Sequence, residues 1–284
     1  MAVRKTIRPI TISRVVEYCR LIQSGKTSIS QIENELALSD SRVKEIAREL
    51  QVMNLLKIEE DQLVPNHNTF AFLENFEQEN WDAIHSFFFT NYPFYRTYIN
   101  LLEKNLDTEQ GRTFDSLQTE ANELGLNLNR TAIEVLSDWC DRMGIIQRHL
   151  YTGHIYLLKK SKPNQTEFKK SLVLCFNSLV SNRKPREVYA EIPKLREDVC
   201  ELMKISRELF DNLLREIYFE NIGKIELCSA PITTYAKKSP LSEKQIKPYS
   251  KNGVLAPGFL LKKDREGLAI KNKSYYFLAI HKNI

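Results

Sequence analysis

The sequence lacks several features that would assign it to a specialised class of protein. Nine glycines and ten prolines among 284 residues are too few for a fibrous or low-complexity chain. The longest apolar runs, such as Phe87-Phe88-Phe89, fall far short of the ~20 residues that a membrane-spanning helix needs. No apolar core that would indicate a secretory signal follows Met1. We therefore expect a globular protein that does not enter a membrane.

Disulfide and metal frameworks are also missing. The five cysteines are an odd number and contain no C-x-x-C pair, which is typical of reduced thiols in a cytoplasmic protein. Cys140, His149 and His154 are the nearest approach to a zinc site, but their spacing matches no usual ligand pattern. We expect no metal and no cofactor.

No complete catalytic signature is present either. Ser24-Gly25-Lys26-Thr27 resembles the end of a phosphate-binding loop, but Arg20 stands where its first glycine is required, so a helix end is favoured. Asp138 and Asp141 are three residues apart on a predicted helix, which leaves a metal-dependent nuclease as an enzymatic alternative. We expect a protein that is not an enzyme and has no catalytic residues.

What the sequence does contain is a repeated motif. Residues 35–42 read Glu-Leu-Ala-Leu-Ser-Asp-Ser-Arg, and residues 123–130 read Glu-Leu-Gly-Leu-Asn-Leu-Asn-Arg. The two agree at the Glu, two Leu and Arg positions, and a looser third copy spans residues 201–207. This alignment places Arg42, Arg130 and Arg207 at equivalent positions. Each copy precedes a helical pattern and a strand-like run, so the sequence predicts tandem copies of one small unit.

In the first copy, Ser39 is predicted to cap a helix whose apolar residues recur at helical spacing. This spacing turns the polar residues outward or to the flanks, namely Ser41, Arg42, Lys44, Glu45 and Arg48. A helix of this kind fits the major groove of DNA, and the alternative is an ordinary solvated surface. Glu45 and Glu49 are expected to weaken its positive charge. A hairpin over residues 55–64 follows, with a turn at Glu60-Asp61.

The segment between the first two copies is rich in aromatic residues. Pro93 is predicted to separate two helices, roughly residues 80–91 and 94–104. We expect these rings to form a packed core, with stacking on unpaired bases as the alternative.

In the second copy, Asn129 and Arg130 begin a helix whose remaining outward residues are acidic. Carboxylates would be repelled by phosphate, so this copy is expected to bind protein or to act as a spacer.

Positive charge is concentrated near the C-terminus. Residues 66–160 carry 8 basic and 13 acidic groups, whereas residues 231–284 carry 11 basic and 3 acidic groups. Lysines are scattered through this last segment among Ser, Pro and Gly, followed by two strand-like runs at 268–270 and 275–280. The segment suggests phosphate contacts without base reading, and a solvated tail is the alternative.

In the third copy, Ser206 is predicted to cap a helix that turns Arg207, Asp211 and Arg215 outward.

The three copies resemble the winged-helix branch of the helix-turn-helix superfamily, over roughly residues 10–65, 105–160 and 165–230. The resemblance implies a mainly α fold with small β-hairpins (α+β), built of tandem winged-helix domains. It predicts four segments: 1–65 as module 1, 66–160 as connector and module 2, 161–230 as module 3, and 231–284 as a basic extension with a hairpin. Together with the charge pattern, it predicts these DNA contacts: Ser41, Arg42, Lys44, Arg48, Lys57, Arg207, Lys237, Lys238, Lys262 and Lys263.

The leading hypothesis is a DNA-binding protein or adaptor, of the kind that serves transcription regulation. Its first module and basic tail would contact duplex DNA, and residues 66–160 would contact a protein partner. The alternative is a scaffold subunit of a multiprotein nucleic-acid-processing or defence complex, without DNA affinity of its own.

Overall fold

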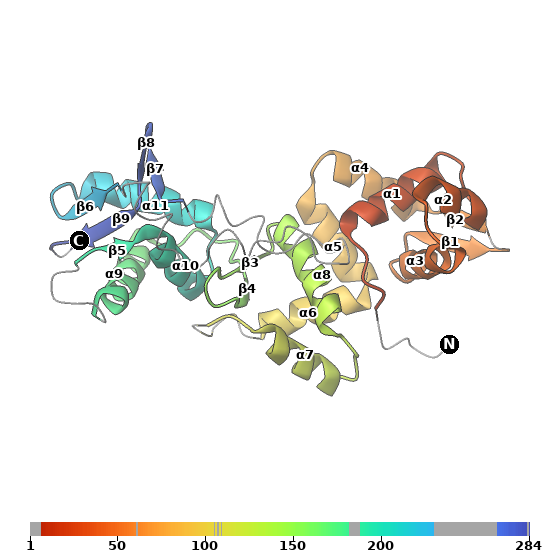
Figure 1. Ribbon diagram of the computed structural model, residues 1–284, viewed down its shortest axis with the longest axis horizontal. Helices are drawn as coiled ribbons and strands as arrows, with labels where there is room; N and C mark the ends of the chain where they lie inside the picture. Colours follow the sequence, from red (N-terminus) through yellow and green to blue (C-terminus); the bar gives the residue numbers. More distant parts are fainter. Residues whose placement is uncertain are drawn as a thin grey trace. The chain divides into compact units, whose positions relative to one another are not determined.

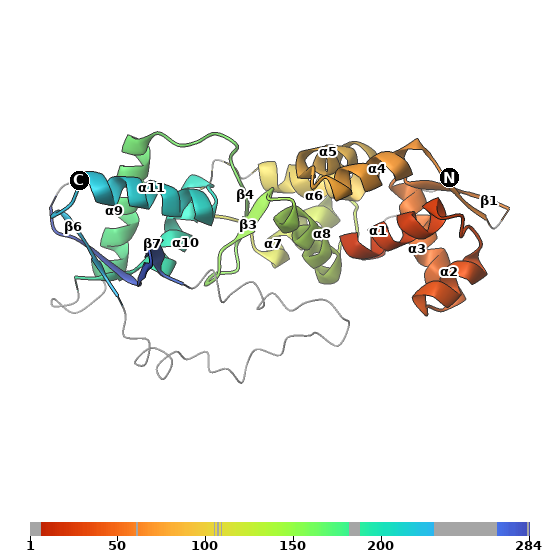
Figure 2. The same cartoon turned by 90° about the horizontal axis from the view of Figure 1, so that it is seen from above.

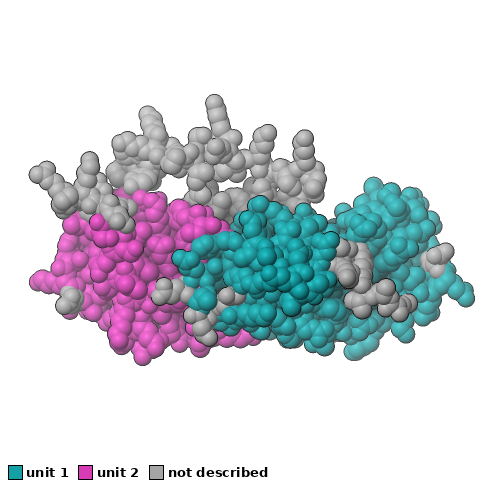
Figure 3. Space-filling model, turned by 90° about the horizontal axis from the view of Figure 1, so that it is seen from below, with its two compact units in different colours: residues 1–148, 154–157 teal, residues 149–153, 158–284 magenta. Residues whose placement is uncertain are grey.

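The computed structural model describes residues 7–60, 62–104, 106, 108, 110–181, 188–229, 266–282 and 284. These residues are mainly helical with small antiparallel hairpins (Figure 1), as the sequence predicted. The chain divides into two compact units (Figure 3): unit 1 comprises residues 1–148 and 154–157, and unit 2 comprises residues 149–153 and 158–284. None of the helices in the described part of the chain combines the length and apolar character that crossing a bilayer requires.

Repeat 1, which we define as residues 12–65, consists of three helices followed by a hairpin. Its elements are α1 (Ile12–Gln23), α2 (Ile29–Leu36), α3 (Asp40–Val52), β1 (Leu56–Glu59) and β2 (Gln62–Pro65). The side chain of Ser39 accepts a hydrogen bond from the backbone N–H of Arg42, so Ser39 caps α3 as predicted. The antiparallel hairpin places Lys57 opposite Val64. Its predicted turn includes Asp61, which lies outside the described residues.

A helical connector leads into repeat 2, which we define as residues 93–157. The elements are α4 (His67–Glu77) and α5 (Trp81–Asn91) of the connector, then α6 (Pro93–Glu103), α7 (Phe114–Glu123), α8 (Arg130–Arg142), β3 (Ile146–Arg148) and β4 (Ile155–Leu157). Pro93 is the first residue of α6, where its missing N–H is no loss, so the helix break lies where it was predicted. Because α6 packs against α7, α8 and β4, it is the first helix of repeat 2.

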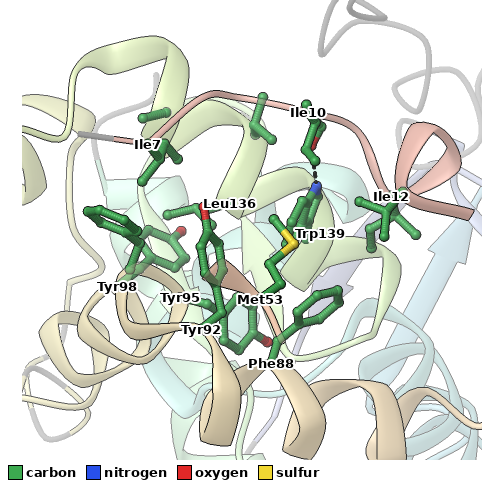
Figure 4. Close-up of a cluster of buried hydrophobic side chains, with 14 of the residues drawn as sticks. Ile7, Ile10, Ile12, Met53, Phe88, Tyr92, Tyr95, Tyr98, Leu136 and Trp139 are labelled. Atoms are coloured by element: carbon green, nitrogen blue, oxygen red, sulfur yellow. Dashed lines mark hydrogen bonds between the residues drawn. The ribbon is translucent and has the colours of Figure 1, made fainter. Parts of the chain in front are cut away.

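Aromatic residues of α5 and α6 pack into the core of unit 1, as predicted (Figure 4). Phe88, Tyr95 and Tyr98 are completely buried. The rings of Phe88 and Trp139 are 4.8 Å apart between centroids, and the indole N–H of Trp139 donates a 3.0 Å hydrogen bond to the carbonyl of Ile10. The core therefore joins repeat 1, the connector and repeat 2, and its buried rings cannot stack on bases. Figure 2 shows α1 of repeat 1 beside α4 of the connector, and α4 beside α5.

Repeat 3, which we define as residues 165–280, lies in unit 2. Its elements are α9 (Gln165–Ser181), β5 (Ala190–Glu191), α10 (Ile192–Met203), α11 (Arg207–Glu220), β6 (Ile225–Cys228), β7 (Leu268–Ile270), β8 (Lys273–Tyr275) and β9 (Phe277–Ile280). Strand β9 lies between β5 and β6 in an antiparallel sheet. The strand-like runs predicted at 268–270 and 275–280 are confirmed, since β7 covers the first run and β9 most of the second. Strands β7 and β8 form a separate hairpin.

The three repeats share details beyond their order of helices and strands. In each repeat, a residue just before the middle helix pairs with a strand that follows the last helix. The pairs are Ser28 with Gln62, Arg112 with Ile155, and Ala190 with Leu278. The turn after the middle helix contains a left-handed residue in every case: Ala37 (φ 50°), Gly125 (φ 77°) and Lys204 (φ 58°). A pairing and a backbone conformation thus recur at matching places.

The entry into the last helix is also the same in each repeat. A side chain caps the helix (Ser39, Asn129 or Ser206). An apolar residue precedes the cap, and a buried apolar residue occupies the fourth helical position, which is the spacing of a hydrophobic staple. These two positions hold Leu38 and Val43, Leu128 and Ile133, and Ile205 and Phe210.

The predicted register of the arginines is wrong. The left-handed residue precedes the cap by two positions in repeats 1 and 3 but by four in repeat 2, because that turn is two residues longer. Arg42 is therefore the third residue of α3, whereas Arg130 and Arg207 are the first residues of α8 and α11. Counted from the cap, the equivalents of Lys44 and Arg48 in repeat 2 are acidic, namely Glu134 and Asp138.

Candidate nucleic-acid interface

The helix α3 exposes a polar surface while its apolar side is buried. Val43 and Leu50 are completely buried, as the spacing predicted. Ser41 and Arg48 are exposed, and Lys44 is half-buried on the same side of the helix. Arg48 makes no ion pair with any described residue, so its guanidinium is available to an anion. The predicted orientation of this surface is confirmed, while its contact with DNA stays a prediction.

The other two cations of α3, Arg42 and Lys44, each form an exposed ion pair with a neighbouring carboxylate. Lys44 lies 2.9 Å from Asp40, and Arg42 lies 3.2 Å from Glu45. Each of these side chains is at least one third exposed. Exposed ion pairs of this kind contribute only about 0–1 kcal/mol. A ligand phosphate can therefore replace the carboxylates at small cost.

Glu49 does not weaken this surface, contrary to the sequence-based expectation. Its side chain is completely buried. One carboxylate oxygen accepts a 3.1 Å hydrogen bond from the backbone N–H of Arg8, and the other accepts a 2.6 Å bond from the hydroxyl of Tyr92. Because Glu49 faces the core, α3 is more cationic on its outer side than its composition suggests.

The hairpin of repeat 1 supplies one further cation. Lys57 is exposed on β1 and makes no ion pair with any described residue. Arg8 also lies beside α3, with its guanidinium 3.4 Å from Glu45. Arg8 could not be identified from the sequence pattern, because it precedes α1 and reaches α3 only through the fold. Arg8 therefore adds a cation beside those of α3, whereas Lys57 is carried by the hairpin.

The corresponding helix of repeat 2 has the opposite charge. Asp138 and Asp141 are exposed, and Glu134 is half-buried and pairs with Arg130 at 3.1 Å. Crowding by protein atoms around Asp138, together with the negative charges of Asp141 and Glu134, raises its pKa from 3.8 to about 6. Charges that repel one another in this way would also repel a phosphate backbone.

In repeat 3, Arg207 does not point outward as predicted. Its guanidinium forms a two-pronged ion pair with Glu197, with Nε to Oε1 at 2.5 Å and Nη2 to Oε2 at 2.9 Å. Glu197 is completely buried and also accepts a 2.8 Å hydrogen bond from the backbone N–H of Leu150. Arg207 thus neutralises a buried carboxylate. Its predicted contact with DNA would compete with this structural role.

The other outward positions of α11 are engaged by the hairpin β7–β8. Arg215 donates a 2.8 Å hydrogen bond from Nε to the carbonyl of Ala269 in β7. Asp211 forms a two-pronged pair with Arg196, whose Nη1 donates to the carbonyl of Glu266 just before β7. These contacts occupy the side of α11 that corresponds to the exposed side of α3.

Four lysines of the basic extension lie outside the described residues: Lys237, Lys238, Lys262 and Lys263. Within the described ranges, no group of three or more His, Cys, Asp or Glu side chains is arranged to hold a metal ion. His149 instead accepts backbone hydrogen bonds at Nδ1 from Tyr151 and Thr152, and its Nε2 lies 3.2 Å from Asp198.

Comparison with known proteins adds no identification, since no protein-family model, curated protein or solved structure matches this chain.

Proposed function

We propose that this chain is a non-enzymatic DNA-binding protein or adaptor composed of three winged-helix repeats. In this assignment α3, α8 and α11 are the recognition helices, and the strands that follow them form the wings. The recurring pairing before the middle helix supports it, as do the left-handed turn and the capped last helix. Repeat 1 contacts duplex DNA, and the basic segment 231–284 adds affinity that does not depend on base sequence.

One observation carries the assignment of DNA binding to repeat 1. The fifth and ninth positions of the last helix hold Lys44 and Arg48 in α3, but Glu134 and Asp138 in α8. Both helices bury apolar residues at their fourth and seventh positions, namely Val43 and Ile46 in α3 and Ile133 and Leu136 in α8, whereas the fifth and ninth positions are partly or fully exposed in each. A duplex presents a dense row of phosphates, which favours α3 and disfavours α8. The division of charge supports one repeat for DNA and another for a protein partner.

Fluorescence anisotropy with a labelled 20-base-pair duplex tests this assignment. The variant K44Q/R48Q should bind about tenfold or more weakly than the wild-type chain, because two phosphate contacts are lost. R96Q/K104Q is the matched control, since it removes two exposed cations of unit 1 from α6 and its C-cap. It should change the affinity less than about twofold. Equal losses in the two variants would argue against a specific role for α3.

A scaffold subunit without DNA affinity is the second candidate, and one observation favours it. The outward side of α11 is occupied by β7–β8, and that of α8 is acidic, so two of the three repeats are poorly suited to DNA. This candidate predicts that the wild-type chain leaves the anisotropy of the duplex unchanged even at 50 mM salt.

A further inference from the structure

Two arginines from distant parts of the chain flank a single carboxylate on repeat 1. Arg8 Nη2 lies 3.4 Å from one oxygen of Glu45, and Arg42 Nη1 lies 3.2 Å from the other. The Arg8 side chain is 51% exposed and that of Arg42 is 39% exposed, so a ligand in solution can reach both. Glu45 therefore lies between two accessible guanidinium groups.

The backbone that carries Arg8 is firmly held. Ile7 and Ile10 are buried in the core of unit 1 (Figure 4). The backbone N–H of Arg8 itself is bound by the buried carboxylate of Glu49. Arg42 is tied to the same segment, because its Nη2 donates a 3.3 Å hydrogen bond to the carbonyl of Pro9. The two arginines are thus positioned by the fold before any ligand arrives.

The ligand that suits this arrangement is a phosphodiester. Guanidinium groups bind carboxylate and phosphate oxygens with the same paired geometry. A phosphate placed at Glu45 would meet the same donors, and the exposed pairs that it displaces are weak. Glu45 is the sixth residue of α3. The sixth residue is the buried Val135 in α8 and the exposed Asn212 in α11, so neither helix has a carboxylate between two arginines at this position.

We propose that Arg8 and Arg42 form a phosphodiester-binding site beside α3, and that Glu45 occupies this site in the absence of DNA and competes with a DNA phosphate for it. This inference rests on the proposed function, since it assigns a particular backbone contact within the α3 surface. It makes Glu45 a residue that limits affinity and Arg8 a contact that the sequence alone did not reveal.

The test measures the affinity of the full chain for the labelled duplex in 100 mM salt. E45Q should bind about three- to tenfold more tightly, because the competing carboxylate is removed. R8Q should bind more weakly and reduce the slope of log K against log salt by about 1. In the R8Q background, E45Q should gain less than it does alone. Thermal unfolding of each variant confirms that the fold is intact.

E17Q is the matched control. Glu17 pairs with Arg14 at 2.8 Å on α1, and both side chains are about as exposed as those of the proposed site. The substitution adds the same unit of net charge but frees one arginine instead of two, and it should tighten binding less than about twofold. An affinity of E45Q for the duplex that is no higher than that of E17Q would overturn the proposed site. The ion pairs of Glu45 with Arg8 and Arg42 would then only hold the N-terminal segment against α3. If neither the wild-type chain nor any variant binds the duplex at low salt, the proposed function itself fails.

Discussion

The hydroxyl of Tyr92 donates a 2.6 Å hydrogen bond to the buried carboxylate of Glu49, which lies 43 residues earlier in the chain. This contact joins the inner side of α3 to the junction between α5 and α6. The same carboxylate binds the backbone of Arg8, and the ring of Tyr92 packs 6.1 Å from that of Trp139. The position of α3 in unit 1 is therefore fixed by a polar contact within an aromatic core.

Y92F should destabilise the protein, because it leaves a buried carboxylate oxygen without its donor. The expected loss is about 1–3 kcal/mol in the free energy of unfolding. Chemical denaturation followed by circular dichroism measures it.

Y18F is the matched control for Y92F. The hydroxyl of Tyr18 is also buried, but it has no hydrogen-bond partner among the described residues. Removing it should leave stability unchanged or increase it slightly, because an unsatisfied polar group is taken out of the core. Similar losses from both substitutions would mean that the contact between Tyr92 and Glu49 adds nothing specific.

R207Q should strongly destabilise unit 2 without affecting the DNA contacts of repeat 1. It leaves the completely buried Glu197 without its cation, and breaking such a pair costs about 3–5 kcal/mol. R215Q provides the comparison, since Arg215 is partly exposed and binds a carbonyl rather than a buried charge; it should cost about 1 kcal/mol. If R207Q unfolds like the wild-type chain yet binds duplex DNA more weakly, Arg207 is a DNA contact, as the sequence predicted.

D138N should raise the melting temperature at neutral pH. The pKa of Asp138 is raised from 3.8 to about 6 by protein atoms around it and by Asp141 and Glu134. The folded chain therefore keeps this proton to a higher pH than the unfolded chain does, and stability is lost as the pH rises from about 4 to about 6.

The asparagine in D138N does not ionise, so it contributes no loss of stability as the pH rises. Its advantage in melting temperature over the wild-type chain should be small at pH 4, grow across this interval and remain constant above pH 7. Calorimetry at several pH values measures the difference, and an advantage independent of pH would contradict the assigned pKa.

Local features of the repeats could be predicted from the sequence. Caps such as Ser39 and Ser206 act on the first turn of their own helix, and Pro93 marks a break by its own geometry. Helical spacing likewise identified the buried side of α3. The signals for these features lie within a few residues of the structure that they determine.

Features that depend on distant contacts could not be predicted in this way. Glu49 has the pattern of a surface residue, and only Arg8 and Tyr92, each about 40 residues away, turn it into a buried one. Arg207 was assigned to the surface because Glu197 lies on another helix. The predicted equivalence of Arg42 and Arg130 was wrong because the turn before α8 is two residues longer than the turn before α3. The matching residues of the motif give no sign of this difference in length.

The salt dependence of duplex binding tests the central claim, that repeat 1 contacts DNA through α3, most directly. Anisotropy titrations between 50 and 200 mM salt should give a straight line of log K against log salt for the wild-type chain. Its slope should be about −3 or steeper, which corresponds to roughly four phosphate contacts. In K44Q/R48Q the slope should become shallower by about 2. A wild-type affinity that is indifferent to salt, or a slope that K44Q/R48Q leaves unchanged, would contradict the claim.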